Sequence, residues 1–494
     1  MNNLHLCRFS YLENVSVCKR YNKVWLIHYE EETAAGVLKT LLPNDLIGKE
    51  IHLEISVESV VDMDAIAVDI VDNMIPVAWD GSTLIKADKT NTNNNWFDYD
   101  TQKWANAVLV TSASRENIKS ADVGTTILED DILAYYTYVP RYRYLLWNTN
   151  NNENCLNNNC NEQEIKIEFE NKNVTKSSGS TNGEWLTHPA FTFGESELNG
   201  IWVGKFTTSA DPASRCYTSP ARANCNVKSI SPIIKPNLDM WRYTRVATMS
   251  SVTKQIETNS MYGLNSYDNA DSHMMKNMEW GAVAYLSHSK YGKYGNDEYS
   301  GADKQLYINN YRTSSAAGYK TETGCSSGAP YTATNTTSCP HSYPAQTPAA
   351  LGASTTGNIY GIYDMSGGVW EYVMGQIVQS VGTPLGIFHA NSGSGTWDTI
   401  PQQKYYDSYT YDTNELSHGR GQLGDATRET LLEFGTNENG GWYGDQSRFP
   451  YSTYVWFLRG GYASNGSQAG AFAFARNEGA ANAYYGFRVL LALE

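Results

Sequence analysis

The stretch at residues 358–375, NIYGIYDMSGGVWEYVMG, constrains the fold more than any other part of this chain. Two successive glycines, Gly367 and Gly368, allow positive φ angles beside large neighbouring side chains. Trp370 brings a large apolar surface, and its indole N–H needs a hydrogen-bond partner once it is buried. We therefore predict a tight turn that leads into an aromatic strand over residues 369–374, and we interpret this stretch as rigid scaffold.

Composition narrows the class of protein. Among 494 residues there are 35 Tyr and 13 Trp, which is typical of β-rich proteins with ordered loops and of adaptable binding surfaces. The formal net charge of −15 argues against a nucleic-acid partner, because phosphate binding needs clustered Lys and Arg. No window has the apolar run of a membrane span, so no membrane insertion is predicted, and the first residues lack the apolar core of a signal peptide.

The eight cysteines fall into four pairs that are local in sequence: Cys7 and Cys18, Cys155 and Cys160, Cys216 and Cys225, Cys325 and Cys339. Disulfides would imply that the protein works outside a reducing cytosol, whereas zinc is the alternative. We favour disulfides, because no pair has the two-residue spacing of zinc ligands. The nine histidines show no metal-ligand spacing either, so no metal site is predicted. A structural Ca²⁺ held by loop carboxylates stays open as an alternative.

Segment patterns predict two domains. Residues 1–90 read as a small β-rich domain, with short alternating strands at 24–28 and 51–57, and the Asn-rich run at 89–95 reads as a linker. In the domain at 91–494, residues 132–147 form a strand pair interrupted at Pro140. A long helix is predicted over 271–289 from its apolar periodicity, and a short one over 426–434. The last forty residues return to strand.

The ordered motifs of the larger domain resemble the formylglycine-generating enzyme, or sulfatase-modifying factor, superfamily. They are YTYVPRYRYLLW (136–147), NMEWGAVAYLSH (277–288), GIYDMSGGVWEY (361–372), LRGGY (458–462) and GFRVLLAL (486–493). The resemblance covers roughly residues 95–494. It implies an α+β, C-type-lectin-like fold with long loop insertions, here preceded by the small β-rich domain.

The resemblance does not extend to the catalytic residues of that superfamily. Catalytic members carry copper-binding cysteines after the RGG motif, whereas the last cysteine of this chain is Cys339, and residues such as Ser464 and Asn465 occupy that region. Neither Ser nor Asn replaces a thiolate as nucleophile or copper ligand. We therefore predict a protein that is not an enzyme and needs no cofactor.

A non-catalytic branch of the superfamily fits better. Variable proteins of diversity-generating retroelements, and phage tail receptor-binding proteins, keep the scaffold and end in a diversified segment between an RGG-like and a GFR-like strand. Residues 462–485, YASNGSQAGAFAFARNEGAANAYY, resemble such a segment, and we name them the C-terminal cassette. Their Asn, Ser, Gly and Tyr content also suits ligand contact, although the same residues are ordinary in turns.

The resemblance and the composition together give a set of expected contact residues. The expected ligand-binding residues are Tyr462, Ser464, Asn465, Phe474, Arg476, Asn477, Asn482, Tyr484 and Tyr485 of the cassette, joined by Trp442 and Tyr443. The residues assigned to the scaffold are Trp370, Glu371, Arg459, Gly460, Gly461, Phe487 and Arg488.

The expected function is a receptor-binding protein of a bacteriophage tail or virion that recognises a host surface protein or glycan. The domain at 1–90 would attach it to other virion proteins, and a homo-oligomer is expected, a trimer by analogy with tail fibres. The expected location is the virion, outside cells when the protein functions. Two alternatives stay open: a diversified binding protein displayed on a bacterial surface, and an oxidase-like enzyme of the parent superfamily.

Overall fold

The structure, a computed structural model, describes residues 66–150, 153–212, 225–315, 318–332, 334–380, 383–384 and 393–494. The chain divides into two compact units between Val60 and Val61. The strands predicted at 24–28 and 51–57 lie outside the described residues. No helix among those described is both long and apolar enough to cross a bilayer.

The predicted domain boundary at residue 90 needs correction, because residues 75–86 belong to the main sheet of the larger unit. Strand β1 (Ile75–Trp79) pairs with β2 (Leu84–Lys86) and with β3 (Asn106–Val110). The Asn-rich run at 89–95 is therefore not a linker between domains. The side-chain oxygen of Asn91 accepts the backbone N–H groups of Trp96 and Phe97, each at 2.9 Å, as expected of an asparagine-centred turn.

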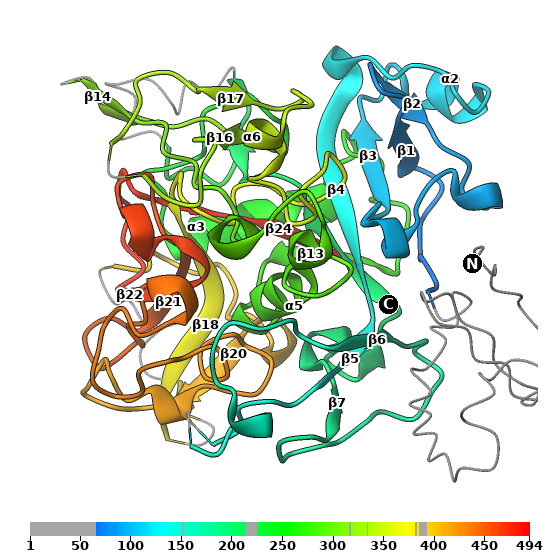
Figure 1. Cartoon of the computed structure of the whole chain (residues 1–494). Helices are drawn as coiled ribbons and strands as arrows, with labels where there is room; N and C mark the ends of the chain where they lie inside the picture. Colours follow the sequence, from blue (N-terminus) through cyan, green and yellow to red (C-terminus); the bar gives the residue numbers. More distant parts are fainter. Residues whose placement is uncertain are drawn as a thin grey trace, which may run out of the picture. The chain divides into compact units, whose positions relative to one another are not determined.

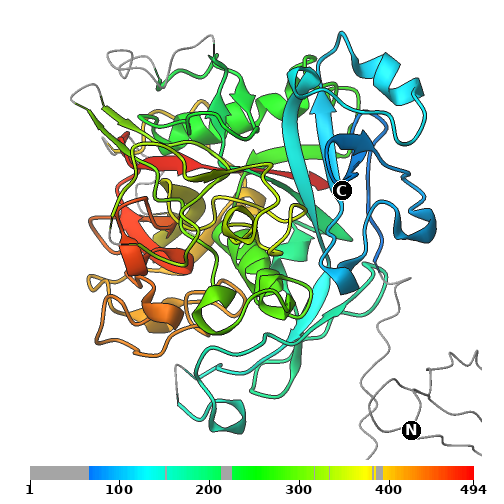
Figure 2. The same ribbon diagram turned by 45° about the horizontal axis from the view of Figure 1, so that its top comes forward.

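A seven-stranded antiparallel sheet forms the first layer, in the order β13-β24-β10-β4-β3-β1-β2 (Figure 1). Its remaining strands are β4 (Ile132–Pro140), β10 (Gly200–Gly204), β13 (Ala270–Met274) and β24 (Val489–Leu493). The C-terminal strand β24, red in Figure 2, therefore lies inside the sheet, paired on both sides. Burial between two neighbours fixes this end of the chain.

The second large sheet is centred on β18 (Trp370–Ser380), the strand predicted from the opening stretch. One edge of β18 pairs antiparallel with β21 (Trp456–Gly460), which pairs with β22 (Gly470–Asn477). Three short strands also pair with β18: β19 (Thr383–Pro384), β20 (Asp407–Thr410) and β23 (Tyr485–Phe487). β18 therefore joins the RGG and GFR segments.

Smaller strands decorate these two sheets. A three-stranded sheet has β5 (Tyr142–Leu145) at its centre, between β6 (Ile167–Phe169) and β7 (Trp185–Thr187). Two-stranded ladders are formed by β8 (Thr192–Phe193) with β9 (Ser196–Glu197), β11 (Ser209–Ala210) with β12 (Pro232–Ile233), β14 (Thr313–Ser315) with β15 (Gly318–Lys320), and β16 (Cys325–Ser326) with β17 (His341–Ser342). The strand pair predicted around Pro140 is confirmed by β4 and β5.

Helices are few and short in the described part of the chain. The described α-helices are α2 (Arg115–Ser120), α3 (Val246–Thr253), α4 (Gln255–Thr258), α5 (Asn277–Ser287) and α6 (Pro348–Leu351). Every residue of α5 is buried, and the helix contacts β4 of the first sheet and β18 and β22 of the second. A helix with no polar face is typical of such an internal position. The predicted α+β class is confirmed.

Two predicted helices differ from the structure. Residues 270–274 form strand β13, and the helix begins only at Asn277, where the Glu279 carboxylate accepts the Lys276 backbone N–H at 2.7 Å. Residues 270–274 pair with β24, so the tertiary partner decides between strand and helix. No helix forms over 426–434. Ala426 has φ 54°, which interrupts a right-handed helix.

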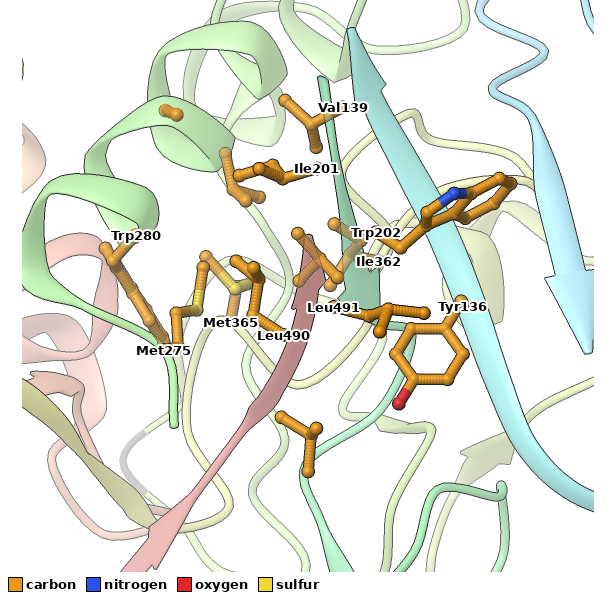
Figure 3. Packing of buried hydrophobic residues seen from close by; sticks show 14 of the residues in the cluster. Tyr136, Val139, Ile201, Trp202, Met275, Trp280, Ile362, Met365, Leu490 and Leu491 are labelled. Carbon is orange, nitrogen blue, oxygen red and sulfur yellow. The ribbon is translucent and has the colours of Figure 1, made fainter. Parts of the chain in front are cut away.

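The main core lies where α5 meets the first sheet (Figure 3). Trp280 and Met275 approach Met365 and Leu490 there, and Trp202 lies on the far side. The indole N–H of Trp280 donates to the carbonyl of Ala471 at 2.7 Å. This core therefore joins the opening stretch, α5 and the last strand in one contact region.

Gly367 provides a stability test of the opening stretch. Its φ is +81°, and an added Cβ would lie 2.5 Å from the carbonyl oxygen of Asn309. Gly367→Ala is expected to lower the free energy of unfolding by about 2–3 kcal/mol, from the left-handed backbone and the clash together. Gly124→Ala is the matched control, because Gly124 has φ +88° with nothing within 4 Å, and should cost only about 1–2 kcal/mol. Equal losses of unfolding free energy in the two variants, measured with urea, would refute the contribution of the steric clash at Gly367.

Candidate functional site: the surface of the C-terminal cassette

Acidic residues of the opening stretch are the first candidates for chemistry, and their contacts identify them as scaffold. Glu371 forms a two-point ion pair with Arg488, at 2.6 and 3.1 Å, and accepts the Thr207 hydroxyl at 2.6 Å. Both charged side chains are at most 1% exposed. Burial raises the pKa of Glu371, and Arg488 opposes that rise. A carboxylate enclosed in this way has no access to a substrate.

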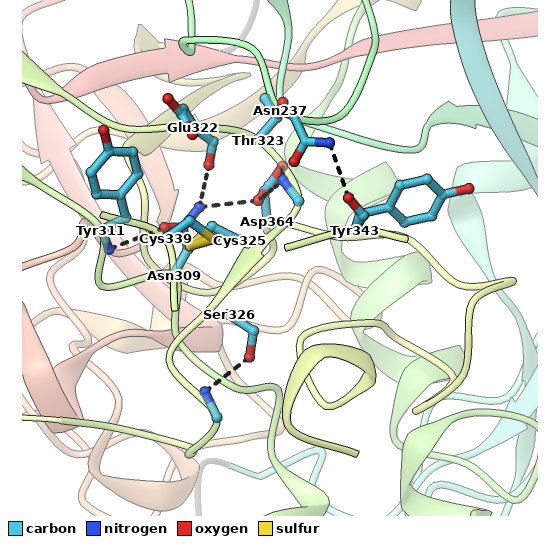
Figure 4. The surroundings of a disulfide bond; sticks show 12 residues. Asn237, Asn309, Tyr311, Glu322, Thr323, Cys325, Ser326, Cys339, Tyr343 and Asp364 are labelled. Carbon is cyan, nitrogen blue, oxygen red and sulfur yellow. Dashed lines mark hydrogen bonds between the residues drawn. A yellow bond between two sulfur atoms is a disulfide. The ribbon is translucent and has the colours of Figure 1, made fainter. Parts of the chain in front are cut away.

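Asp364 is enclosed as well. It accepts the backbone N–H of Gly324 at 2.9 and 3.0 Å and the side-chain amide of Asn309 at 3.3 Å. Burial raises the pKa of Asp364 to about 7, against the lowering effect of Arg488. Figure 4 shows this carboxylate beside the Cys325–Cys339 disulfide. Its hydrogen bonds hold neighbouring loops to the opening stretch.

Two of the predicted cysteine pairs are confirmed as disulfides, Cys155–Cys160 and Cys325–Cys339. The pair Cys7 and Cys18 lies outside the described residues, as does Cys216. The confirmed bridges each close a polar loop. The second holds the loop that supplies Asn335 to the surface described next.

Two glycine pairs lie together and fix the start of the cassette: Gly367 with Gly368, and Gly460 with Gly461. Gly367 N–H donates to the Gly460 carbonyl at 3.1 Å, and Ala463 N–H donates to the Gly368 carbonyl at 3.1 Å. Gly460 and Gly461 have φ 84° and 80°, a conformation that glycine adopts without strain. The turn after β21 is thereby fixed against the turn before β18.

Tyr462 and Tyr484 meet across the two ends of the cassette. Their ring centroids are 5.2 Å apart, and both rings pack against the small buried cluster of Met240, Val369 and Ala463. Both tyrosines are half-buried. The Tyr484 carbonyl accepts the Trp370 N–H at 2.9 Å. The pair is therefore held on a firm base while part of each ring faces solvent.

Polar side chains surround this tyrosine pair. Ser464 Oγ accepts a hydrogen bond from Arg312 Nη1 at 2.6 Å and donates one to Asn335 Oδ1 at 2.9 Å. Asn335 also donates to the Ala463 carbonyl at 2.8 Å, and the Arg312 guanidinium lies 5.7 Å from the Tyr484 ring centre. We name these five residues, Tyr462, Ser464, Tyr484, Arg312 and Asn335, the tyrosine patch.

Sequence reasoning did not find Arg312 and Asn335. Both come from the polar region at 296–356, which carries no periodicity and no motif that points to the cassette. Of the residues predicted nearby, Asn465 folds its side-chain oxygen back onto the Tyr462 N–H at 2.8 Å. Its amide therefore shapes the turn under the patch.

Two other predicted contact residues, Asn477 and Tyr485, form a second group, and Arg476 has a different partner. Asn477 donates to the Tyr485 hydroxyl at 3.0 Å and accepts from the Tyr372 hydroxyl at 2.6 Å. Arg476 forms an ion pair with Glu415. Tyr484 and Tyr485 thus contribute to different groups, as successive residues of an extended chain do. The predicted residues do not form one continuous surface.

The remaining predicted contacts are mostly structural. The Asn482 carbonyl accepts the Tyr243 N–H at 2.9 Å. Tyr443 is half-buried, and its hydroxyl lies 2.7 Å from Nε2 of His288. The Tyr443 side chain and the Asn482 backbone therefore hold their loops in place.

Phe474 and Trp442 require correction, because both are 0% exposed. Phe474 lies in β22 and packs edge-on to Phe449. The Trp442 indole N–H donates to the Cys160 carbonyl at 3.0 Å. In β22 the residues of both faces are buried up to Ala475, so the alternation of Phe and Ala did not separate a surface face from a core face. All seven residues assigned to the scaffold are buried.

Comparisons with known proteins include a distant structural likeness. No family model matches the sequence, and none of the curated proteins matches it. Among solved structures, PvdO from Pseudomonas aeruginosa is similar over 74% of this chain and 96% of its own, with 11% sequence identity and a TM-score of 0.28.

Proposed function

We propose that this protein is a non-enzymatic binding protein with a C-type-lectin-like fold, and that it recognises its ligand through the tyrosine patch. The observation that carries the proposal is the half-buried pair of Tyr462 and Tyr484 on a fixed base. Tyrosines held in this way offer contact area at low cost in conformational entropy. Arg312, Ser464 and Asn335 add donors and acceptors around them.

The ligand class proposed is a host surface protein or glycan, and the setting proposed is a phage tail or virion. These follow from the resemblance of the motifs and of the cassette, not from the comparisons. The unit before Val61 would then serve attachment to other virion proteins. A bacterial surface protein with the same patch would bind in the same way, so gene neighbourhood separates the two settings.

The test is binding of the purified chain to a panel of bacterial surface polysaccharides and whole bacterial cells. Tyr462→Ala and Tyr484→Ala should each weaken binding about 30-fold or more, as removal of a central aromatic contact does. Each change should lower the free energy of unfolding by only about 1–2 kcal/mol, so the variants stay folded during the assay.

Tyr411→Ala is the control for the binding test, because Tyr411 is 37% exposed and lies outside the patch. It should bind like the unchanged protein. Unchanged binding by both patch variants, an equal loss in Tyr411→Ala, or no binding to any member of the panel would each contradict the proposal.

A further inference from the structure

A pocket of about 320 Å³ opens between α3 and residues 397–405, and its lining includes no residue of the tyrosine patch. Met274 of β13 and Met374 of β18 line it, with Trp397 and Tyr405 from the loop. Its volume is at the lower end of the range of small-molecule sites. A pocket of this volume has room for a single sugar unit or a molecule of similar size.

The aromatic wall of the pocket is held in place. The Trp397 ring stacks on Trp456, with centroids 6.1 Å apart and 22° between the ring planes. The Trp456 indole N–H donates to Ser394 Oγ at 2.8 Å, and Ser394 Oγ donates to the Glu478 carbonyl at 3.1 Å. Trp397 therefore presents a fixed apolar surface beside the pocket.

The charged groups of the pocket are already paired with one another or with neighbours. Lys254 contacts Asp271 at 2.9 Å, and Asp398 contacts Lys228 at 2.6 Å. His273 lies between two carboxylates, Asp271 at 3.2 Å and Glu279 at 3.1 Å. A strongly charged ligand would have to break these ion pairs, which opposes its binding.

Neutral polar groups complete the lining. Ser250 and Ser251 come from α3, and Thr399 and Gln402 from the loop. Hydroxyl and amide side chains both donate and accept hydrogen bonds. A ligand that suits them carries several hydroxyl groups and, against Trp397, an apolar C–H face.

We propose that this pocket is a second ligand site and binds a neutral pyranose unit. The C–H face of the sugar ring lies against Trp397, and the sugar hydroxyls face α3 and Gln402. The site is independent of the tyrosine patch, so either proposal stands or fails without the other.

The experiment is saturation-transfer NMR of the whole chain with neutral methyl pyranosides: glucoside, galactoside, mannoside and N-acetylglucosaminide. We expect at least one to bind with a Kd on the order of 1 mM, with saturation strongest on the ring C–H protons. A methyl glucuronide and a methyl glucosaminide should bind at least about tenfold more weakly, because of the paired charges.

Substitutions inside and outside the pocket test whether the saturation-transfer signal comes from a sugar bound in the pocket. Trp397→Ala should weaken binding about tenfold or more, and Gln402→Ala, at an exposed position, should weaken it about threefold or more through the loss of one hydrogen bond. Trp185→Ala, at a half-buried tryptophan in β7, and Tyr484→Ala should leave it unchanged.

Four outcomes would overturn the proposal of a second site. The first three are the absence of saturation for every neutral pyranoside at about 20 mM, well above the expected Kd; unchanged binding in both Trp397→Ala and Gln402→Ala; and tighter binding of the charged sugars. Loss of pyranose binding in Tyr484→Ala would place the sugar in the tyrosine patch and would also overturn it.

Discussion

Replacing Arg488 with Met is expected to lower the free energy of unfolding by about 3–5 kcal/mol, because it leaves a buried carboxylate without its partner. Arg488 is 0% exposed and binds Glu371 through two nitrogens. It also donates to the carbonyls of Gly204 at 2.7 Å and Tyr363 at 3.0 Å. Urea unfolding of Arg488→Met against the unchanged protein measures the loss.

Two further variants show whether the buried charge is the cause. Lys166→Met removes an ion pair with Glu164 whose lysine is 58% exposed, and should change stability by at most about 1 kcal/mol. The double variant Arg488→Met with Glu371→Leu removes both charges and should be more stable than Arg488→Met alone. A loss below about 1 kcal/mol in Arg488→Met would contradict the assignment.

Replacing Glu429 with Gln is expected to change how stability depends on pH. The Glu429 carboxyl is fully buried and accepts the hydroxyls of Tyr144 at 3.0 Å and Tyr285 at 2.8 Å, and the Gly424 N–H at 2.7 Å. Burial raises its pKa to about 7 in the folded protein, from 4.5. The folded state therefore favours the protonated carboxyl.

The sign of the pH effect follows from this raised pKa. The contribution of Glu429 is fully present below about pH 4.5 and is lost as the pH rises to about 7. With 1.36 kcal/mol for each pKa unit, the loss is on the order of 3 kcal/mol. Glu429→Gln does not titrate, so its stability should fall less than that of the unchanged protein between about pH 5 and pH 8.

Urea unfolding of both proteins at several pH values measures this difference. Subtracting one curve of unfolding free energy against pH from the other removes the contribution of the other buried acidic residues. Glu433→Gln, at an exposed position four residues along the chain, is the control. Its free energy of unfolding should depend on pH in the same way as that of the unchanged protein. Parallel curves for Glu429→Gln and the unchanged protein would show that Glu429 does not titrate in this range.

Much of the scaffold could be predicted from sequence because its motifs combine several signals. Gly367 and Gly368 indicate a turn, and the aromatic run after them indicates a buried strand, which is β18. The polar loops around Cys155 and Cys325 correctly indicated local disulfides. In each case the signal that supports the prediction lies within one short stretch of sequence.

The errors have tertiary causes. Residues 270–274 precede an apolar stripe at helical spacing, yet they pair with β24, a strand more than two hundred residues later in the chain. Glu429 lies in a segment of helix formers, but its carboxylate turns inward to Tyr144 and Tyr285. Arg312 reaches Ser464 across a long sequence separation. Local patterns do not encode such partners.

The fixed ends of the cassette determine where its sequence can vary. Gly460 and Gly461 hold its beginning against the opening stretch, and β23 pairs its last residue with Trp370. The scaffold therefore closes this loop regardless of which residues lie between its two ends. The entropy cost of closing the loop does not depend on the side chains of those residues. Ser464 and Asn465 make side-chain hydrogen bonds at the start of the cassette, and β22 is buried as far as Ala475. Substitution should therefore be tolerated best at residues 467–468 and 480–482, on either side of this buried strand.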